Sequence, residues 1–232
     1  EHACLIEAVE ETDIGGEVIC WGHNHHGQAE PPLVRAAWRG FTAASAAAVK
    51  RRGTDLLPRH ALQDLFVQIS AAATYTCGVT LEQHIICWGE VPHEKHLPGA
   101  DFVQVTASVS HTCGLHQTGK TECWGHSRMV DKPVPDAPLV QVSAGRDHSC
   151  GLDKDGRIHC WGRDYHGSTF SPEGSFVQVS ASDSGAVCAV EEDGSVLCWG
   201  GFVGGVTRDA VFRWPGAFSQ VTVGSDWFCA LD

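Results

Sequence analysis

Cysteine is the residue type that most suggests chemistry in this chain, because ten of its eleven cysteines fall into pairs. In four pairs the cysteines are ten positions apart, and in the pair nearest the N-terminus they are sixteen apart. Structural zinc sites usually use cysteines separated by about two to four residues, a spacing that is missing from this sequence. The regular spacing therefore predicts disulfides, which form in an oxidising compartment. The predicted bonds are Cys4–Cys20, Cys77–Cys87, Cys113–Cys123, Cys150–Cys160 and Cys188–Cys198.

Cys229 is the remaining cysteine, and the spacing rule gives it no partner within the chain. An unpaired cysteine in a secreted protein indicates either an intermolecular disulfide or a partner in sequence beyond these residues. The sequence leaves both interpretations open.

Histidines form two clusters in segments expected to be loops. His23, His25 and His26 lie in one segment, and His93 and His96 lie in the other. Imidazole is a good ligand for zinc or copper, so these five residues are candidate metal ligands and a divalent cation is a candidate partner. With fourteen histidines in the chain, such clusters also arise by chance. We therefore predict no bound metal and no other cofactor.

Two further patterns are weighed as catalytic sites and set aside. His2, His111 and His148 each lie two positions before the first cysteine of a pair, which predicts a recurring hydrogen bond to a neighbouring strand. Asp183-Ser184-Gly185 resembles a serine-protease nucleophile turn, but its place just before Cys188 favours an ordinary connection. Neither a phosphate-binding loop nor a repeated carboxylate pair is found, so we predict a protein that is not an enzyme.

The elements that position these residues form a repeat. The second cysteine of each pair begins a Cys-Trp-Gly triplet, and the triplets end at Gly22, Gly89, Gly125, Gly162 and Gly200. From Cys77 to Cys188 the first cysteines recur every 36 to 38 residues, which is typical of a propeller or another repeat array. Each repeat has three strand-like pieces: an alternating piece such as Phe102 to Val105, a piece around the first cysteine, and a piece ending in Cys-Trp-Gly. We expect the recurring tryptophans to pack between repeats.

The second and third pieces are predicted to form a hairpin that places its two cysteines opposite each other. The central residues of three such hairpins are Gln117-Thr118-Gly119, Lys154-Asp155-Gly156 and Glu192-Asp193-Gly194. Three-residue hairpin loops favour glycine at the last position, where the backbone is left-handed. Each disulfide would close a loop of about 11 residues and contribute roughly 2–3 kcal/mol in the chain-entropy model.

One more repeat is predicted between Cys20 and Cys77. When Gly53 is aligned with the hairpin glycines, Ala47 and Leu57 occupy the two cysteine positions, as expected if a bonded pair was lost together. The alternative is an Ala-rich helix over residues 35–52.

These repeats predict one all-β domain over residues 1–232, a seven-bladed β-propeller of antiparallel blades closed by the two termini. A six-bladed ring is the alternative. The repeats lie near residues 1–27, 33–59, 66–91, 102–126, 139–167 and 176–201, with an incomplete one at 218–232. Closure would place the strand of Phe218 to Val223 beside the hairpin of Cys4 and Cys20.

The repeat resembles that of the regulator of chromosome condensation (RCC1) family, whose members are seven-bladed β-propellers. The resemblance rests on the pattern Phe-Val-Gln-Val-Ser-Ala, His-Ser-Cys-Gly-Leu, Asp-Gly and Cys-Trp-Gly. Residues 21–28 also match the Trp-Gly-x-Asn-x-x-Gly-Gln pattern of that family, and 161–167 match it in part. The cysteine pairs resemble its extracellular branch, such as the ectodomains of plant crinkly-type receptor kinases. Family members exchange nucleotide on a small GTPase, inhibit a secreted β-lactamase or form receptor ectodomains, so the fold does not define the function.

Composition limits the partners. A formal net charge of −12 disfavours nucleic acid, because phosphate contacts need clustered Lys and Arg. The sequence lacks a run of about 18 apolar residues that would insert into a membrane, and Glu1 is not followed by a signal-peptide pattern. We predict a secreted or cell-surface structural or binding module whose loops bind a protein partner or copies of itself. The alternatives are a self-assembling filament or surface-layer subunit and a secreted metal-dependent hydrolase.

Overall fold

The computed structural model describes residues 2–8, 16–22, 66–91, 99–125, 133–201, 211–224 and 227–232. It divides into two compact units, Glu1–Val105 and Thr106–Asp232, and each unit is described by itself. The regular structure of these ranges is all β-strand, and they contain no helix able to cross a membrane. The predicted repeat at 33–59, with Ala47 and Leu57, lies outside the described residues, as does the alternative helix over 35–52.

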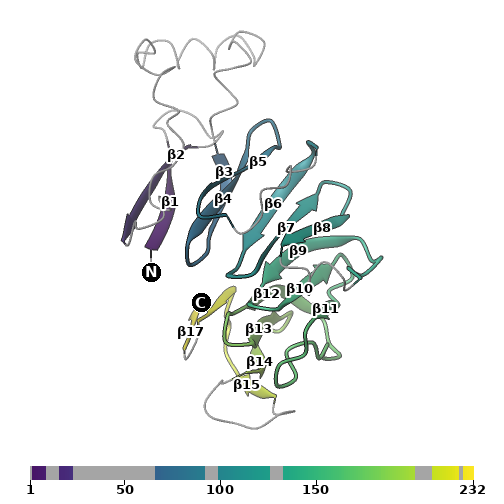
Figure 1. Ribbon diagram of the computed structural model, residues 1–232. Helices are drawn as coiled ribbons and strands as arrows, with labels where there is room; N and C mark the ends of the chain where they lie inside the picture. Colours follow the sequence, from purple (N-terminus) through teal and green to yellow (C-terminus); the bar gives the residue numbers. More distant parts are fainter. Residues whose placement is uncertain are drawn as a thin grey trace, which may run out of the picture. The chain divides into compact units, whose positions relative to one another are not determined.

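The first unit contains a five-stranded antiparallel sheet whose strands follow sequence order (Figure 1). The strands are β1 (His2–Ala8), β2 (Gly16–Gly22), β3 (Phe66–Ala71), β4 (Tyr75–Thr80) and β5 (Ile85–Gly89). A single residue pair, Gly16 and Phe66, joins the hairpin of β1 and β2 to the repeat formed by β3 to β5. The next strand, β6 (Phe102–Ala107), crosses the boundary between the units.

The second unit repeats the same three-strand pattern. β6 is followed by β7 (His111–His116) and β8 (Thr121–Gly125) in one sheet, and β9 (Leu139–Ala144), β10 (His148–Asp153) and β11 (Ile158–Gly162) form the next. A four-stranded sheet then contains β12 (Phe176–Ala181), β13 (Ala186–Glu191), β14 (Val196–Gly200) and β15 (Phe212–Trp214), and β16 (Gln220–Val223) pairs with β17 (Phe228–Leu231). β12 packs against β9 of the preceding sheet and β16 of the following one. Recurring antiparallel sheets of this size are propeller blades, so the all-β prediction is confirmed, whereas the number of blades and the closure stay predictions.

In each described repeat the second and third strands form a hairpin with its two cysteines in register. Cys150 lies opposite Cys160, and their Cα atoms are 4.1 Å apart, the short spacing of a non-hydrogen-bonded antiparallel pair. The structure contains the disulfides that the spacing predicts: Cys4–Cys20, Cys77–Cys87, Cys113–Cys123, Cys150–Cys160 and Cys188–Cys198. Cys229 is free and exposed.

The hairpin turns have the left-handed residue that the sequence predicts. Gly119, Gly156 and Gly194 have φ values of 87°, 77° and 84°. Each glycine carbonyl also accepts a hydrogen bond from the first residue of the next repeat, as in the 2.8 Å bond from the Phe176 amide to Gly156. The turn therefore closes one blade and starts the next.

Gln83 takes the place of the turn glycine in the repeat of β3 to β5. Its φ is 62°, and its carbonyl oxygen accepts the Phe102 amide at 3.0 Å. A residue with a Cβ is disfavoured in this conformation, so the turn is formed at an energetic cost.

The first strands do not alternate without interruption as the sequence suggests. The strand pairing skips Val67 in β3, Val140 in β9 and Val177 in β12, and the side chains of these valines are exposed. Each valine is the extra residue of a β-bulge, which has no partner opposite it and so leaves the regular in-and-out order. The prediction of simple alternation was therefore wrong at this position.

The glutamine after the bulge binds the main chain of the next repeat. Gln178 accepts the Val221 amide through Oε1 at 2.9 Å and donates to the Val221 carbonyl through Nε2 at 3.0 Å. The contact recurs between Gln68 and Val105 within the first unit, and Gln141 accepts the Val179 amide. These bonds, which we call the glutamine ladder, connect successive first strands.

A hydroxyl two residues further along the first strand makes a second connection. Ser180 Oγ accepts the Val223 amide at 3.2 Å, and Thr106 Oγ1 accepts the Ala144 amide at 3.0 Å. Polar residues on the first strand are therefore satisfied by backbone groups of the following blade, which the repeat pattern Gln-x-Ser/Thr provides for.

Apolar packing fills the space between adjacent sheets. Leu152, Ile158, Phe176, Val179 and Trp199 belong to one buried cluster between β9–β11 and β12–β14. Trp161 packs similarly with Cys113, Leu115, Leu139 and Val142 of its own and the preceding repeat. The prediction that the recurring tryptophans pack between blades is thus confirmed for Trp161 and Trp199.

Candidate functional site

Four loops lie at the same end of the sheets of the second unit. Three of them connect the first strand of a repeat to its second strand, and the fourth follows the third strand β11. We call them the loop face and define it as residues 108–110, 145–147, 163–170 and 182–185. The Arg163 amide donates to the Asp147 carbonyl at 2.7 Å, and the Ser110 hydroxyl donates to the Arg146 carbonyl. The first bond joins two loops of the same repeat, and the second joins loops of successive repeats.

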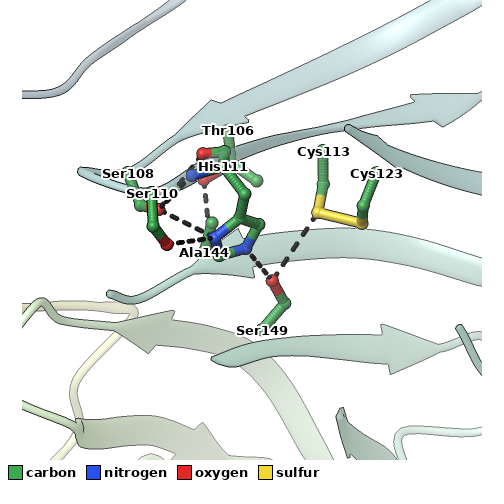
Figure 2. Close-up of a disulfide and its surroundings, with 8 residues drawn as sticks. All are labelled: Thr106, Ser108, Ser110, His111, Cys113, Cys123, Ala144 and Ser149. Carbon is green, nitrogen blue, oxygen red and sulfur yellow. Dashed lines mark hydrogen bonds between the residues drawn. A yellow bond between two sulfur atoms is a disulfide. The ribbon is translucent and has the colours of Figure 1, made fainter. Parts of the chain in front are cut away.

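The side chain of His111 hydrogen-bonds both with the 108–110 loop of the loop face and with the next repeat (Figure 2). Its Nδ1 hydrogen-bonds with Ser108 Oγ at 3.0 Å and lies 3.2 Å from Ser110 Oγ, and its Nε2 hydrogen-bonds with Ser149 Oγ at 2.7 Å. The side chain of His111 is fully buried. Ser149 belongs to the next repeat, so the prediction of a bond from this histidine position to a neighbouring strand is confirmed for His111.

His148 occupies the same position one repeat later but lacks the second contact. Its side chain is buried, and within the described residues its Nε2 has no hydrogen-bond partner. In the following repeat Val187 stands where Ser149 would be, and valine has no hydroxyl. Burial, and to a smaller extent the neighbouring His111, lower the pKa of His148 to about 4, so the ring is neutral at pH 7.

Asp183 is the half-buried acid of the loop face. Burial raises the pKa of its carboxyl, Asp147 adds to this, and a hydrogen bond from the Val109 amide together with the charge of Arg146 acts in the opposite direction. The Val109 amide belongs to a loop two repeats earlier in the chain. A carboxyl group thus lies where three loops of the loop face meet.

The Asp183-Ser184-Gly185 segment has the geometry of a connection between strands. The Ser184 hydroxyl hydrogen-bonds with Ser182 Oγ at 2.9 Å, and Ser182 Oγ donates to the Ala186 carbonyl. Gly185 has a φ of 90° and ends the turn. These contacts hold the loop in shape and support the interpretation of the segment as a turn.

The 163–170 loop presents aromatic side chains from a fixed support. Tyr165 and Phe170 are about half exposed, at 49% and 50%. Ser168 of the same loop is fully buried, and its Oγ accepts the Tyr165 amide at 2.9 Å and donates to the Arg163 carbonyl at 3.3 Å. Aromatic groups held on ordered backbone lose little entropy when a partner covers them. The sequence marks this loop only by a partial motif match at 161–167.

The metal-ligand candidates cannot be assigned to this site. His23, His25, His26, His93 and His96 lie outside the described residues. Among the described side chains, no group of three or more His, Cys, Asp or Glu is placed to hold a metal ion. The loop face offers hydrogen-bonding groups, charges and aromatic surface.

Comparisons with known proteins agree with this architecture. The family model of the regulator of chromosome condensation (RCC1) repeat matches residues 139–168, the repeat that contains β9 to β11. No match was found among curated protein sequences.

Several solved structures share the fold. The ectodomain of the Physcomitrella patens receptor kinase CR4 is 19% identical with a TM-score of 0.63, over 93% of this chain and 53% of that ectodomain. The chain thus spans about half of that ectodomain. The crinkly ectodomain of the Arabidopsis thaliana receptor kinase ACR4 is 22% identical with a TM-score of 0.60, over 99% of this chain and 88% of the other. Yeast RCC1 (Prp20), solved bound to Kap60, is 15% identical with a TM-score of 0.66, over 99% of this chain and 65% of the other. Residues 139–168 thus match the RCC1 repeat, and the chain has the fold of the RCC1-type β-propellers.

Proposed function

We propose that this chain is an extracellular, non-catalytic β-propeller that binds a protein partner through its loop face. The observation that carries the proposal is the rigid display of Tyr165 and Phe170 on the 163–170 loop. Aromatic residues are enriched among the residues that contribute most to protein–protein binding, because they bury a large area with few rotatable bonds.

Charged groups on the loop face give it a means of selecting a partner. Arg163 Nη1 lies 3.9 Å from the carboxylate of Asp147, and both side chains are accessible. Asp183 lies at the meeting point of the neighbouring loops. Charged groups of both signs on a binding surface favour complementary partners and disfavour others.

The extracellular location is supported by the five disulfides. Such bonds persist in oxidising compartments and are rare where thiols are kept reduced. Two of the solved structures with this fold are receptor-kinase ectodomains. The structure of yeast RCC1 bound to Kap60 supports a protein as the class of partner.

The proposal is tested by cross-linking the folded chain to proteins secreted by, or displayed on, its source cells. The test variant is Tyr165→Ser with Phe170→Ser. The matched control is Val140→Ser with Val177→Ser, which removes exposed apolar groups from the first strands instead. We expect a cross-linked partner that the control retains and the test variant loses by at least about tenfold, since hot-spot contacts are each worth about 2 kcal/mol or more.

Equal capture by both variants would show that the loop face is not the binding surface. Sedimentation of the unmodified chain separates this function from self-assembly into filaments, which would appear as mass that rises with concentration. A metal-dependent hydrolase would instead show activity that a chelator removes.

A further inference from the structure

We infer that Cys123 is a site of S-thiolation: a small thiol of the glutathione type attacks its sulfur and opens the Cys113–Cys123 disulfide, with Cys113 as the leaving group. This bond joins β7 to β8, and the side chains of His111 and Ser149 lie beside it (Figure 2). The inference goes beyond partner binding by the loop face. Its test uses no protein partner, so either proposal can fail without the other.

Ser149 connects the disulfide to a buried imidazole. Its Oγ lies 3.6 Å from Cys113 Sγ and 2.7 Å from His111 Nε2. All three residues are fully buried, and hydrogen bonds are stronger in such surroundings than in water. We call this series, from the ring nitrogen through the hydroxyl to the sulfur, the serine relay.

The hydrogen bonds on the other side of the ring define the tautomer of His111. Ser108 Oγ donates to the His111 carbonyl at 3.1 Å, and Ser110 Oγ donates to the Arg146 carbonyl. Because each hydroxyl has a single proton, both oxygens act as acceptors towards Nδ1, which therefore carries the ring proton. In the neutral ring Nε2 is then an acceptor, and the Ser149 hydroxyl donates to it. The ring is thus oriented to take up a second proton at Nε2, and the two serine oxygens at Nδ1 stabilise the charged form.

Solvent access selects the sulfur that is attacked. Cys113 is completely buried, whereas Cys123 is only partly buried. Exchange requires attack on one sulfur and departure of the other, so an incoming thiolate reaches Cys123 and releases Cys113. Cys160 in the next repeat is also partly buried, so access alone does not distinguish the two hairpins.

The exchange needs no external oxidant. The glutathione thiolate donates an electron pair to Cys123 Sγ, the bond between the two protein sulfurs breaks, and its electron pair leaves on Cys113. His111 Nε2 takes up one proton, equal to the one that the glutathione thiol releases, and donates to Ser149 Oγ, whose hydroxyl turns to the Cys113 thiolate. A thiol that is stabilised as the thiolate by a protonated histidine has a lowered pKa, and a thiol of lower pKa leaves faster.

The Cys150–Cys160 disulfide of the next repeat provides a natural comparison. Val187 stands at the position of Ser149 and has no hydroxyl to donate. Cys150 Sγ lies 3.9 Å from the Ser168 carbonyl oxygen, which cannot donate a hydrogen bond to a thiolate. The serine relay therefore separates two disulfides that have the same hairpin geometry.

Reaction of the folded chain with reduced glutathione tests the inference. Samples are quenched with acid after brief exposure, free thiols are alkylated, and mass spectrometry of the peptides measures the rate of adduct formation at each disulfide. We expect glutathione on Cys123 and a free thiol on Cys113. This adduct should form at least about tenfold faster than the adduct at Cys150–Cys160, because its leaving thiol has the lower pKa.

Ser149→Ala distinguishes the relay from a structural role of the serine. Loss of the relay should slow the reaction at Cys123 by at least about tenfold. If Ser149 only stabilised the fold, the same variant would react faster, because a loosened hairpin exposes its disulfide. The matched control is Ser149→Thr, which keeps the hydroxyl and should keep the fast rate. Thr76 at the equivalent position places its Oγ1 3.7 Å from Cys4 Sγ, so a threonine there reaches the sulfur.

The reciprocal variant is Val187→Thr, which introduces a hydroxyl between His148 and the Cys150–Cys160 disulfide. It should raise the rate of adduct formation at Cys160 roughly two- to tenfold, the factor of one added hydrogen bond to the leaving thiolate. The rate at Cys123 should not change in this variant.

Several results would overturn the inference. They are equal rates at the two disulfides of the wild type, a faster reaction at Cys123 in Ser149→Ala, and glutathione attached to Cys113 in place of Cys123. An unchanged rate at Cys160 in Val187→Thr would do the same, and this variant decides the matter where Ser149→Ala does not fold.

Discussion

His111 Nε2 lies 2.7 Å from Ser149 Oγ, so a buried histidine of one blade is satisfied by a hydroxyl of the next. The next repeat keeps the histidine, as His148, but replaces the hydroxyl residue with Val187. The two positions form a natural comparison between a satisfied and an unsatisfied buried imidazole, and they lead to the first two predictions.

Substitution Val187→Thr should stabilise the second unit slightly by giving His148 Nε2 a partner while keeping one buried methyl group, and threonine occupies the equivalent position as Thr76 and Thr112. The hydrogen bond should add about 0.5–1.5 kcal/mol to the free energy of unfolding, reduced by the methyl group that valine loses. The reciprocal change Ser149→Ala should cost about 1–3 kcal/mol, because it leaves His111 Nε2 buried without that partner. Urea unfolding with the disulfides intact measures both, and a loss of stability in both variants beyond the valine contribution would contradict the pairing.

The stability of the second unit should fall in mild acid because of His148. Its pKa is about 4 in the folded chain and 6.5 for the ordinary side chain, so between these values the unfolded chain binds a proton that the folded chain does not. The free energy of unfolding is therefore unaffected by His148 above about pH 6.5 and decreases as the pH falls towards about 4. The total decrease is about 3 kcal/mol. Unfolding curves of the wild type and His148→Phe across this range test it, and a constant difference between them would show that His148 does not titrate in this way. Tyr75, which is buried at the equivalent position, indicates that an aromatic ring fits there.

Replacing Gln83, which has a left-handed backbone conformation, with glycine should stabilise the turn. Gln83→Gly should raise the free energy of unfolding by about 1 kcal/mol, because glycine adopts a φ near 60° without the Cβ penalty. In the turn of the β10–β11 hairpin, Gly156→Ala should have the opposite effect, since its Cβ would lie 2.9 Å from Ser175 Oγ and 3.1 Å from the Phe176 carbonyl oxygen. Thermal or urea unfolding of the two variants decides the matter, and equal effects would rule out turn conformation as the cause.

Loss of a rung of the glutamine ladder should destabilise the contact between neighbouring blades. Gln178→Ala leaves the amide and carbonyl groups of Val221 without their partner, at a cost of about 1–3 kcal/mol. The control is Gln220→Ala, which changes an exposed glutamine on β16. Hydrogen exchange should show faster exchange at the Val221 amide in the first variant only, and unchanged protection there would contradict the role of the ladder.

Closure of the ring by its termini remains a prediction of the repeat pattern. The strand of Phe218 to Val223 should lie beside the hairpin of Cys4 and Cys20, which would remove open strand edges. Distances between spin labels at Ala3 and at Ser219, both exposed positions, measure this arrangement in solution. A broad distribution of long distances would indicate an open array of blades instead.

The parts of the fold that could be predicted from the sequence are the local ones. The register of Cys150 with Cys160 follows from two equal strand lengths and a glycine turn, all within one hairpin. The bond from Gln178 to Val221 joins different repeats, and nothing in the spacing states which backbone a side chain will reach. Val177 is a good strand residue whether it is paired or bulged, so its composition does not reveal the bulge. The turn at Gln83 could not be recognised from the sequence, because the turn requires a positive φ angle, which glycine favours but other residues can also adopt.

The site is even less visible in the sequence than the fold. The backbone at Tyr165 is held by the buried Ser168, and a buried serine in a loop carries no distinctive sequence pattern. The histidines at 111 and 148 look equivalent in the sequence, and only the residue across the blade boundary separates their chemistry.

The glutamine ladder has a consequence for how such a chain can evolve. Each glutamine side chain binds only the backbone amide and carbonyl groups of a residue in the next repeat. Every amino acid other than proline has both of these groups. A blade can therefore be duplicated, exchanged or inserted without a matching change in the blade that follows. The loops vary in sequence and length from repeat to repeat, and they can diverge towards new partners while the joints between modules stay the same.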